Sequence, residues 1–172
     1  VCLDYPSVGA TENIMLAATH AEGETTIENA AKEPEIGDLQ GFLNACGFRV
    51  RGAGSSTIVI TGGGKGRGAQ YRIMPDRIVA GTLLTAGAIA GGQISVTDAP
   101  REQLVSVLEK LRQAGCDIRE EAQRVTLTAP LRPRELPRVD TMPYPGFPTD
   151  MQAQLFALCS VAEGTSCIAE NV

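Results

Sequence analysis

The stretch Thr26-Ile27-Glu28-Asn29-Ala30 decides the fold, because it recurs about 69 residues later as Ser95-Val96-Thr97-Asp98-Ala99. Each copy follows a short segment that ends in glycine and precedes an apolar-periodic stretch, a second glycine and an alternating apolar run. A third copy begins at Ile168-Ala169-Glu170-Asn171, close to the last residue. Repetition at this period indicates a protein built from copies of one supersecondary unit.

Each copy is expected to contain a helix, a strand, a second helix and two strands, with a further strand entering the first helix. Ser7 and Thr149 are the expected N-caps of two of these first helices, and Gly23, Gly92 and Gly164 stand where helix C-caps are expected. The predicted fold class is α+β (α/β), with about two and a half β-α-β-α-β-β units. One copy alone leaves an apolar face exposed, so several copies are expected to pack helix face against helix face.

Composition narrows the class of protein. The chain has 172 residues, 43% of them hydrophobic and 20% charged, which is typical of a globular protein with a sizeable core. It has no apolar run long enough to cross a bilayer and no signal-peptide pattern at its start, so a cytoplasmic protein without a membrane partner is expected. A net charge of −5 and the absence of Trp disfavour general nucleic-acid binding.

The five cysteines are expected to be reduced thiols. They form no C-x-x-C pair, and the single histidine offers little help for a metal site. Cys46 and Cys116 lie beside glycines at the ends of apolar-periodic stretches, as small buried residues at helix C-termini would. His20, among apolar neighbours on the first helix, is expected to be a core or boundary histidine with its hydrogen bonds satisfied rather than a catalyst.

The boundary between the first two repeat units is expected between residues 62 and 76. The glycine-rich run 62–68 matches neither phosphate-binding loop pattern and is predicted to be a flexible hairpin that closes the first unit. Met74-Pro75-Asp76 opens the second unit, with Asp76 as a helix cap or ion-pair partner. The missing initial Met and the incomplete third copy lead us to expect a part of a longer polypeptide, with oligomerisation of a short chain as the alternative.

Two helix starts are candidate sites. Ser7-Val8-Gly9 begins a helix whose free N–H groups suit a phosphate, although Glu12 opposes an anion and a plain helix start remains an alternative. Asp150 lies in the first turn of another helix, where it is either a partner of the helix dipole or a general base. The local sequence does not decide between these two roles.

Four separated motifs, in order, resemble the UDP-N-acetylglucosamine 1-carboxyvinyltransferase family, which are enolpyruvyl transferases of bacterial peptidoglycan synthesis. The motifs are Pro6-Ser7-Val8-Gly9-Ala10-Thr11-Glu12-Asn13, then Glu22-Gly23 with Ile27-Glu28-Asn29-Ala30-Ala31-Lys32-Glu33-Pro34-Glu35-Ile36, then Pro75-Asp76-Arg77-Ile78, and finally Phe147-Pro148-Thr149-Asp150-Met151-Gln152-Ala153-Gln154. The resemblance runs along essentially the whole chain, yet covers only about the middle two-fifths of a family member. The rival within this fold, the transferase that acts on shikimate 3-phosphate, fits the first and last motifs less well.

The resemblance implies two domains, each an inside-out α/β barrel of three repeat units. Residues 1–74 would be the last unit of one domain, and residues 75–172 one complete and one partial unit of the other. The implied reaction transfers the enolpyruvyl group of phosphoenolpyruvate to the 3-hydroxyl of UDP-N-acetylglucosamine, with no metal or organic cofactor. The implied partners are these two small molecules and the remainder of the polypeptide.

The resemblance also implies site residues. Ser7, Val8 and Gly9 would bind the UDP end, Asp150 would abstract the proton of the sugar 3-hydroxyl, and Thr149 and Val172 would contact the substrate. The family's loop cysteine and most phosphoenolpyruvate-binding groups would lie before Val1, so the chain alone is expected to be inactive. A non-catalytic binding or scaffold protein built from the same repeat is the alternative from another class.

Overall fold

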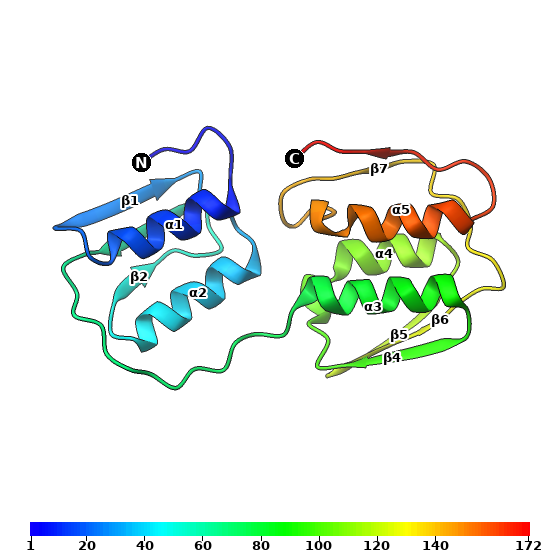
Figure 1. Cartoon of the computed structure of the whole chain (residues 1–172), viewed down its shortest axis with the longest axis horizontal. Coiled ribbons are helices and arrows are strands. Elements are labelled where there is room, and N and C mark those ends of the chain that lie inside the picture. Colours follow the sequence, from blue (N-terminus) through cyan, green and yellow to red (C-terminus); the bar gives the residue numbers. More distant parts are fainter. The chain divides into compact units, whose positions relative to one another are not determined.

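The computed structural model describes residues 1–172 as two compact units, Val1–Met74 and Pro75–Val172 (Figure 1). Each unit combines helices with one three-stranded antiparallel sheet. None of the helices is both long enough and apolar enough to cross a membrane. The α+β class predicted from the repeat is confirmed.

The first unit runs in the predicted order of helices and strands. Its elements are α1 (Val8–Ala18), β1 (Glu24–Glu28), α2 (Pro34–Ala45), β2 (Arg49–Arg51) and β3 (Thr57–Thr61). The sheet order is β1-β3-β2, with both pairings antiparallel. The strand expected to enter α1 is reduced to a single parallel bridge between Cys2 and Glu28.

Local sequence explains these elements. Pro34 stands in the first turn of α2, where its missing N–H costs no hydrogen bond. Along β3, Ile58 and Ile60 are fully buried while their neighbours are more exposed, as alternation along a strand requires. Met15 of α1 and Ile36 of α2 pack into the same apolar cluster as this face of the sheet. The first unit therefore has a core of its own.

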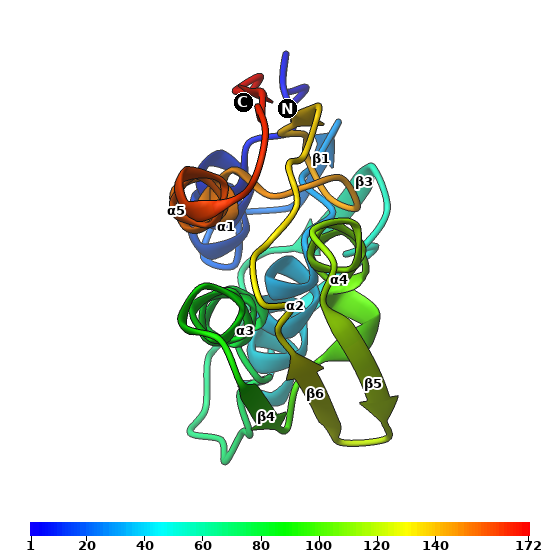
Figure 2. The ribbon, with the colours of Figure 1, turned by 90° about the vertical axis from the view of Figure 1, so that its right-hand side faces the viewer.

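The second unit contains a helix–strand–helix–strand–strand copy and, after it, a shorter strand–helix–strand segment. Its elements are α3 (Arg77–Ala90), β4 (Gln93–Thr97), the 3₁₀ turn η1 (Arg101–Gln103), α4 (Val105–Gln113), β5 (Asp117–Glu121), β6 (Arg124–Thr128), β7 (Val139–Asp140), the 3₁₀ turn η2 (Thr149–Met151), α5 (Gln152–Val161) and β8 (Ile168–Ala169). The sheet order is β4-β6-β5, and β7 pairs with β8 in parallel. In Figure 2, where this unit faces the viewer, α3 and α4 lie above the sheet.

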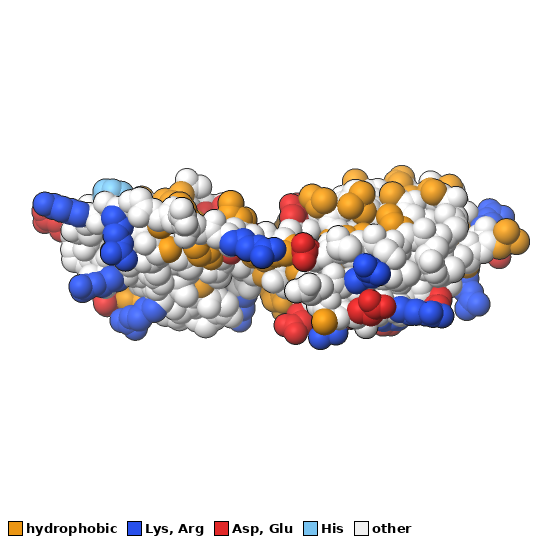
Figure 3. Space-filling view, turned by 90° about the horizontal axis from the view of Figure 1, so that it is seen from below, with side chains coloured by type: hydrophobic (Ala, Val, Ile, Leu, Met, Phe, Trp, Pro, Cys, Tyr) orange, Lys and Arg blue, Asp and Glu red, His pale blue; other side chains and the backbone are white.

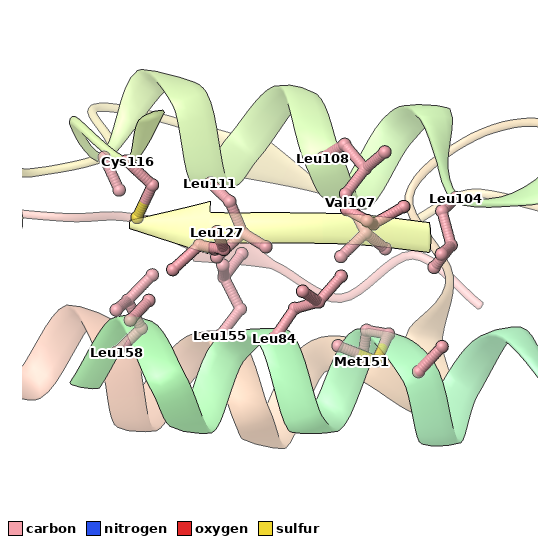
Figure 4. Close-up of a cluster of buried hydrophobic side chains, with 14 of the residues drawn as sticks. Leu84, Leu104, Val107, Leu108, Leu111, Cys116, Leu127, Met151, Leu155 and Leu158 are labelled. Carbon is pink, nitrogen blue, oxygen red and sulfur yellow. The ribbon is translucent and has the colours of Figure 1, made fainter. Parts of the chain in front are cut away.

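The core of the second unit lies where three helices meet the central strand. Leu84 of α3, Leu108 and Leu111 of α4, Leu127 of β6 and Leu155 of α5 point toward one another and are almost entirely buried (Figure 4). Burying a leucine side chain contributes roughly 1.5–3 kcal/mol. This cluster fixes α5, and with it the turn that precedes α5, against the rest of the unit.

Apolar side chains also remain exposed on the helices of the second unit. Figure 3 shows them gathered along one margin of this unit. Val79 and Leu83 of α3 and Phe156 and Val161 of α5 are all more than a third exposed. The two helices therefore present an uncovered apolar face.

Residues 62–68 do not form the predicted hairpin. They contain no strand, and the chain stays irregular until α3 begins. The N–H of Gly62 donates to the carbonyl of Gly23, and the N–H of Arg67 donates to the carbonyl of Cys46. A Cβ atom on Gly64 or on Gly66 would come within 2.9 Å of the ring of Phe48. These glycines therefore allow the connector to pass close to an aromatic ring.

The predicted helix ends need adjustment. Ser7 caps α1 as expected, but the cap of η2 is Pro148, and Thr149 makes no capping bond. The helices end at the C-caps Thr19, Gly91 and Ala162, slightly before the predicted glycines. His20 follows α1 and is exposed, with its Nδ1 atom 2.9 Å from the hydroxyl of Thr19.

Candidate functional site

The start of α1 has the features of an anion site. Ser7 is extended, and its hydroxyl oxygen accepts a 3.2 Å hydrogen bond from the N–H of Ala10. The N–H groups of Val8 and Gly9 precede the first N–H that a helix can satisfy internally. The first turn contains no acidic residue, so Glu12, which we expected to oppose an anion there, lies beyond it. The N-terminus of α1 therefore combines the positive end of the helix dipole with two free N–H donors.

A buried threonine holds this helix start in place. The hydroxyl of Thr11 donates to the carbonyl of Ser7 at 2.8 Å and accepts from the N–H of Ala31 at 3.1 Å. Thr11 is fully buried, so both bonds are shielded from water. The residues around Thr11 do not reveal this role, because Ala31 lies twenty residues further along the chain.

The second helix start is built differently. Pro148 is extended, and the N–H of Met151 donates to its carbonyl at 3.0 Å to close the turn η2. Asp150 lies in the middle of this turn and is exposed, and its carboxylate accepts no hydrogen bond from the chain. It does not cap the helix, so the carboxylate remains available to a ligand. The alternative role, as a partner of the helix dipole, needs no hydrogen bond and also remains open.

Glu170 organises this second site, although sequence analysis did not single it out. Its Oε2 atom accepts a 2.8 Å hydrogen bond from the hydroxyl of Thr149. Its Oε1 atom accepts from the hydroxyl of Thr141 at 2.7 Å and from the N–H of Val172 at 2.8 Å. These donors, led by Thr141, hold the pKa of Glu170 below its usual value. The group is therefore a carboxylate at neutral pH.

The parallel pair β7 and β8 explains why these residues meet. Thr141 directly follows β7 and Glu170 directly follows β8, so both leave the same end of the ladder. Thr141 is fully buried, and its hydroxyl also accepts a 2.9 Å hydrogen bond from the N–H of Asn171. The repeated Glu-Asn pair, present at 28–29 and at 170–171, was the signal in the sequence that could have pointed here.

The predicted site residues thus fall into two groups. Ser7, Val8 and Gly9 lie together in the first unit, whereas Thr149, Asp150 and Val172 lie in the second. Val172 joins its group through its main chain, and its side chain is 54% exposed. Whether the two groups bind one ligand, as the resemblance implies, stays a prediction.

No group of three or more His, Cys, Asp or Glu side chains is arranged to hold a metal ion. All five cysteines are unpaired. Cys116 is buried beyond the end of α4, and burial raises the pKa of its thiol to about 11. This thiol is consequently a packing residue rather than a nucleophile.

Comparison with known proteins agrees with this architecture. The family model described as EPSP synthase (3-phosphoshikimate 1-carboxyvinyltransferase) matches residues 1–172. The chain belongs to this enolpyruvyl transferase family. A solved structure of the enolpyruvyl transferase NikO from Streptomyces tendae, 26% identical, superimposes on 95% of this chain and 39% of its own length, with a TM-score of 0.77. EPSP synthase from Acinetobacter baumannii, 25% identical, covers 98% of this chain and 39% of its own, with a TM-score of 0.64.

Curated enolpyruvyl transferases are considerably more similar in sequence. UDP-N-acetylglucosamine 1-carboxyvinyltransferase 2 of Caldanaerobacter subterraneus subsp. tengcongensis is 52% identical over 99% of this chain and 41% of its own length. UDP-N-acetylglucosamine 1-carboxyvinyltransferase of Finegoldia magna is 50% identical over the whole chain and 41% of its own length. The chain therefore spans about two-fifths of the length of these enolpyruvyl transferases.

Proposed function

We propose that this chain forms part of an enzyme that transfers the enolpyruvyl group of phosphoenolpyruvate to the 3-hydroxyl of UDP-N-acetylglucosamine, the first committed step of peptidoglycan synthesis. The observation that carries the proposal is the identity of about one half, along the whole chain, to relatives named for this reaction. Identity to the EPSP synthase of Acinetobacter baumannii is only 25%. The UDP-sugar acceptor is thus favoured over shikimate 3-phosphate.

The proposed roles follow from the chemistry of the two helix starts. The N–H groups of Val8 and Gly9, beside the cap Ser7, would donate to the diphosphate of the nucleotide. The carboxylate of Asp150 would accept the proton of the sugar 3-hydroxyl as its oxygen forms a bond to C2 of phosphoenolpyruvate. The C2–C3 double bond would open as C3 takes up a proton from an acid of the full-length enzyme. Phosphate would then leave C2 of the tetrahedral adduct while C3 loses a proton, which restores the double bond. Thr149 and Val172 would line the sugar end of the site.

The base role of Asp150 is tested in the full-length protein with the variant Asp150→Asn, which keeps the shape of the side chain and removes its basicity. We expect kcat for UDP-N-acetylglucosamine-dependent phosphate release to fall about 100-fold or more. The control is Asp117→Asn, an exposed aspartate 3.7 Å from Arg119 that should leave turnover unchanged. Wild-type turnover by Asp150→Asn would refute the assignment.

The diphosphate role is tested with Ser7→Asp, which retains a side chain able to cap α1 but adds a negative charge. Unfolding should be nearly unchanged, whereas titration with UDP-N-acetylglucosamine should show at least about tenfold weaker binding, because the charge repels the diphosphate. Equal affinity in the two proteins would argue against an anion at this helix start.

The alternatives are separated by the choice of acceptor. Phosphate release from phosphoenolpyruvate is measured in the full-length protein with UDP-N-acetylglucosamine and, separately, with shikimate 3-phosphate. Turnover only with shikimate 3-phosphate would support the sister activity, and saturable binding without turnover would support a binding module. The 172 residues alone hold about two-fifths of the length of the relatives, so we expect them to show no turnover.

A further inference from the structure

The hydrogen bonds around Glu170 tie three segments of the second unit to one carboxylate. Oε1 accepts from the hydroxyl of Thr141, which follows β7, and from the N–H of Val172, which lies beyond β8. Oε2 accepts from the hydroxyl of Thr149, the first residue of η2. Asp150 is the next residue, and its own carboxylate makes no hydrogen bond within the chain. The only side-chain anchor of this turn at its start is therefore the bond from Thr149 to Glu170.

The anchor itself is well fixed. The fully buried Thr141 accepts a hydrogen bond from the N–H of Asn171, so the proton of its own hydroxyl is directed to Glu170. Asn171 also donates through its side chain to the carbonyl of Thr141 at 3.5 Å. Hydrogen bonds to a charged acceptor are stronger than neutral ones. Both oxygens of Glu170 are thereby held in one orientation.

The corresponding region of the first unit shows that the fold does not need this carboxylate. There the side chain of Asn29 donates to the carbonyl of Leu3 at 2.8 Å, much as Asn171 reaches Thr141. The nearby carboxylate of Glu28, however, accepts no hydrogen bond, and α1 is capped by Ser7 instead. The contacts of Glu170 are therefore particular to the unit that carries Asp150.

We propose that Glu170 is a positioning residue, which holds Thr149 and so fixes the turn that presents Asp150 to the acceptor hydroxyl. This inference rests on the proposed function, in which Asp150 is the base. Small displacements of a catalytic group lower the rate steeply, because the reacting atoms must be aligned. Glu170 acts on kcat through the orientation of Asp150 and makes no contact with the reacting atoms.

The test uses the full-length protein with Glu170→Gln and Thr149→Val, each of which removes one partner of the bond. Thr149→Ser restores the hydroxyl. Glu163→Gln is the control, because Glu163 is exposed and its one ion-pair partner, Arg132, is 3.9 Å away. We expect kcat to fall about tenfold or more in the first two variants, and in Glu170→Gln we expect KM for both substrates to stay within about twofold of wild type. Thr149→Ser should recover most of the kcat that Thr149→Val loses, and Glu163→Gln should stay close to wild type.

The double variant Glu170→Gln/Thr149→Val separates a shared interaction from two independent ones. Because both single changes remove the same bond, the double variant should be no more than about twofold slower than the slower single variant. Multiplication of the two losses would overturn the proposal. So would wild-type kcat in Glu170→Gln, or failure of Thr149→Ser to recover activity.

Amide hydrogen exchange tests whether Glu170 holds the turn without relying on turnover. Amide hydrogen exchange of a peptide spanning 148–156 should be about tenfold faster in Glu170→Gln than in wild type, while peptides from α3 remain unchanged. Unchanged exchange in 148–156 would refute the anchor even if the enzyme is active. If the wild-type protein shows no transfer reaction, the proposed function fails, and the exchange result still decides whether Glu170 holds the turn.

Discussion

The side-chain amide of Asn44 pairs with both backbone polar groups of Val50, donating to its carbonyl at 2.9 Å and accepting from its N–H at 2.8 Å. Val50 lies in the edge strand β2, whose outer side has no neighbouring strand. The last turn of α2 thus supplies the hydrogen bonds that another strand would otherwise make.

Asn44→Ala should lower the free energy of unfolding by about 1–3 kcal/mol, since it leaves two backbone groups of the buried Val50 without partners. The free energy of unfolding of Asn44→Asp should lie between those of wild type and Asn44→Ala, because aspartate keeps the acceptor but loses the donor. Denaturant titration measures both, with Asn13→Ala as the control, because the exposed amide of Asn13 forms a hydrogen bond only within α1. Equal losses for Asn13→Ala and Asn44→Ala would show that the pairing contributes nothing.

Gly62 is expected to tolerate no side chain. A Cβ atom there would lie 2.0 Å from the carbonyl oxygen of Ala21 and 2.7 Å from that of Ala18, and neither backbone atom can easily move aside. Gly62→Ala should destabilise the chain by roughly 1–3 kcal/mol. Gly68→Ala, with no atom within 4 Å of its Cβ, should be neutral or slightly stabilising. Thermal unfolding of the two variants distinguishes a steric effect from a general need for a flexible connector.

The core of the second unit should respond strongly to a cavity. Leu84→Ala removes a fully buried side chain that faces α4, α5 and β6, and should cost about 2–5 kcal/mol. Leu131→Ala makes the same chemical change at a fully exposed position and should stay within about 0.5 kcal/mol of wild type. Similar losses at both positions, measured by chemical denaturation, would contradict the packing described for α3.

Alkylation should distinguish the five thiols. Because burial raises the pKa of Cys116 to about 11, the thiolate that reacts with iodoacetamide is scarce at pH 8 and increases only as pH rises toward that value. Cys2 and Cys167 are exposed and should be labelled first. Peptide mass spectrometry reports each rate, and denaturant should abolish the protection of Cys116. Labelling of Cys116 as fast as Cys2 in the native protein would disprove its burial.

Much of the fold could be predicted from local patterns. Alternation along 57–61 and 124–128 identifies the central strands, because one face of each is buried. Ser7 could be predicted as a cap because its partner, the N–H of Ala10, is only three residues away. Interactions of this kind can be predicted because both partners lie within a few residues of each other in the sequence.

The errors arose where a distant residue decides the outcome. Glycine content suggested a hairpin at 62–68, but the ring of Phe48, far earlier in the chain, determines why Gly64 and Gly66 lack side chains. Thr149 is predicted to cap a helix, yet its hydroxyl donates a hydrogen bond to Glu170 instead. Glu170 was missed for the same reason, since its partners come together only when β7 pairs with β8.

Both three-stranded sheets place the strand that comes last in the sequence at the centre, in the orders β1-β3-β2 and β4-β6-β5. During synthesis on the ribosome, the two outer strands of each sheet emerge before the central strand with which both of them pair. The ladders that β1 and β2 form with β3 are completed only when Thr57–Thr61 has left the exit tunnel. Each three-stranded sheet must therefore wait for its central strand, and a nascent chain that stalls before Thr57 contains helices without this sheet.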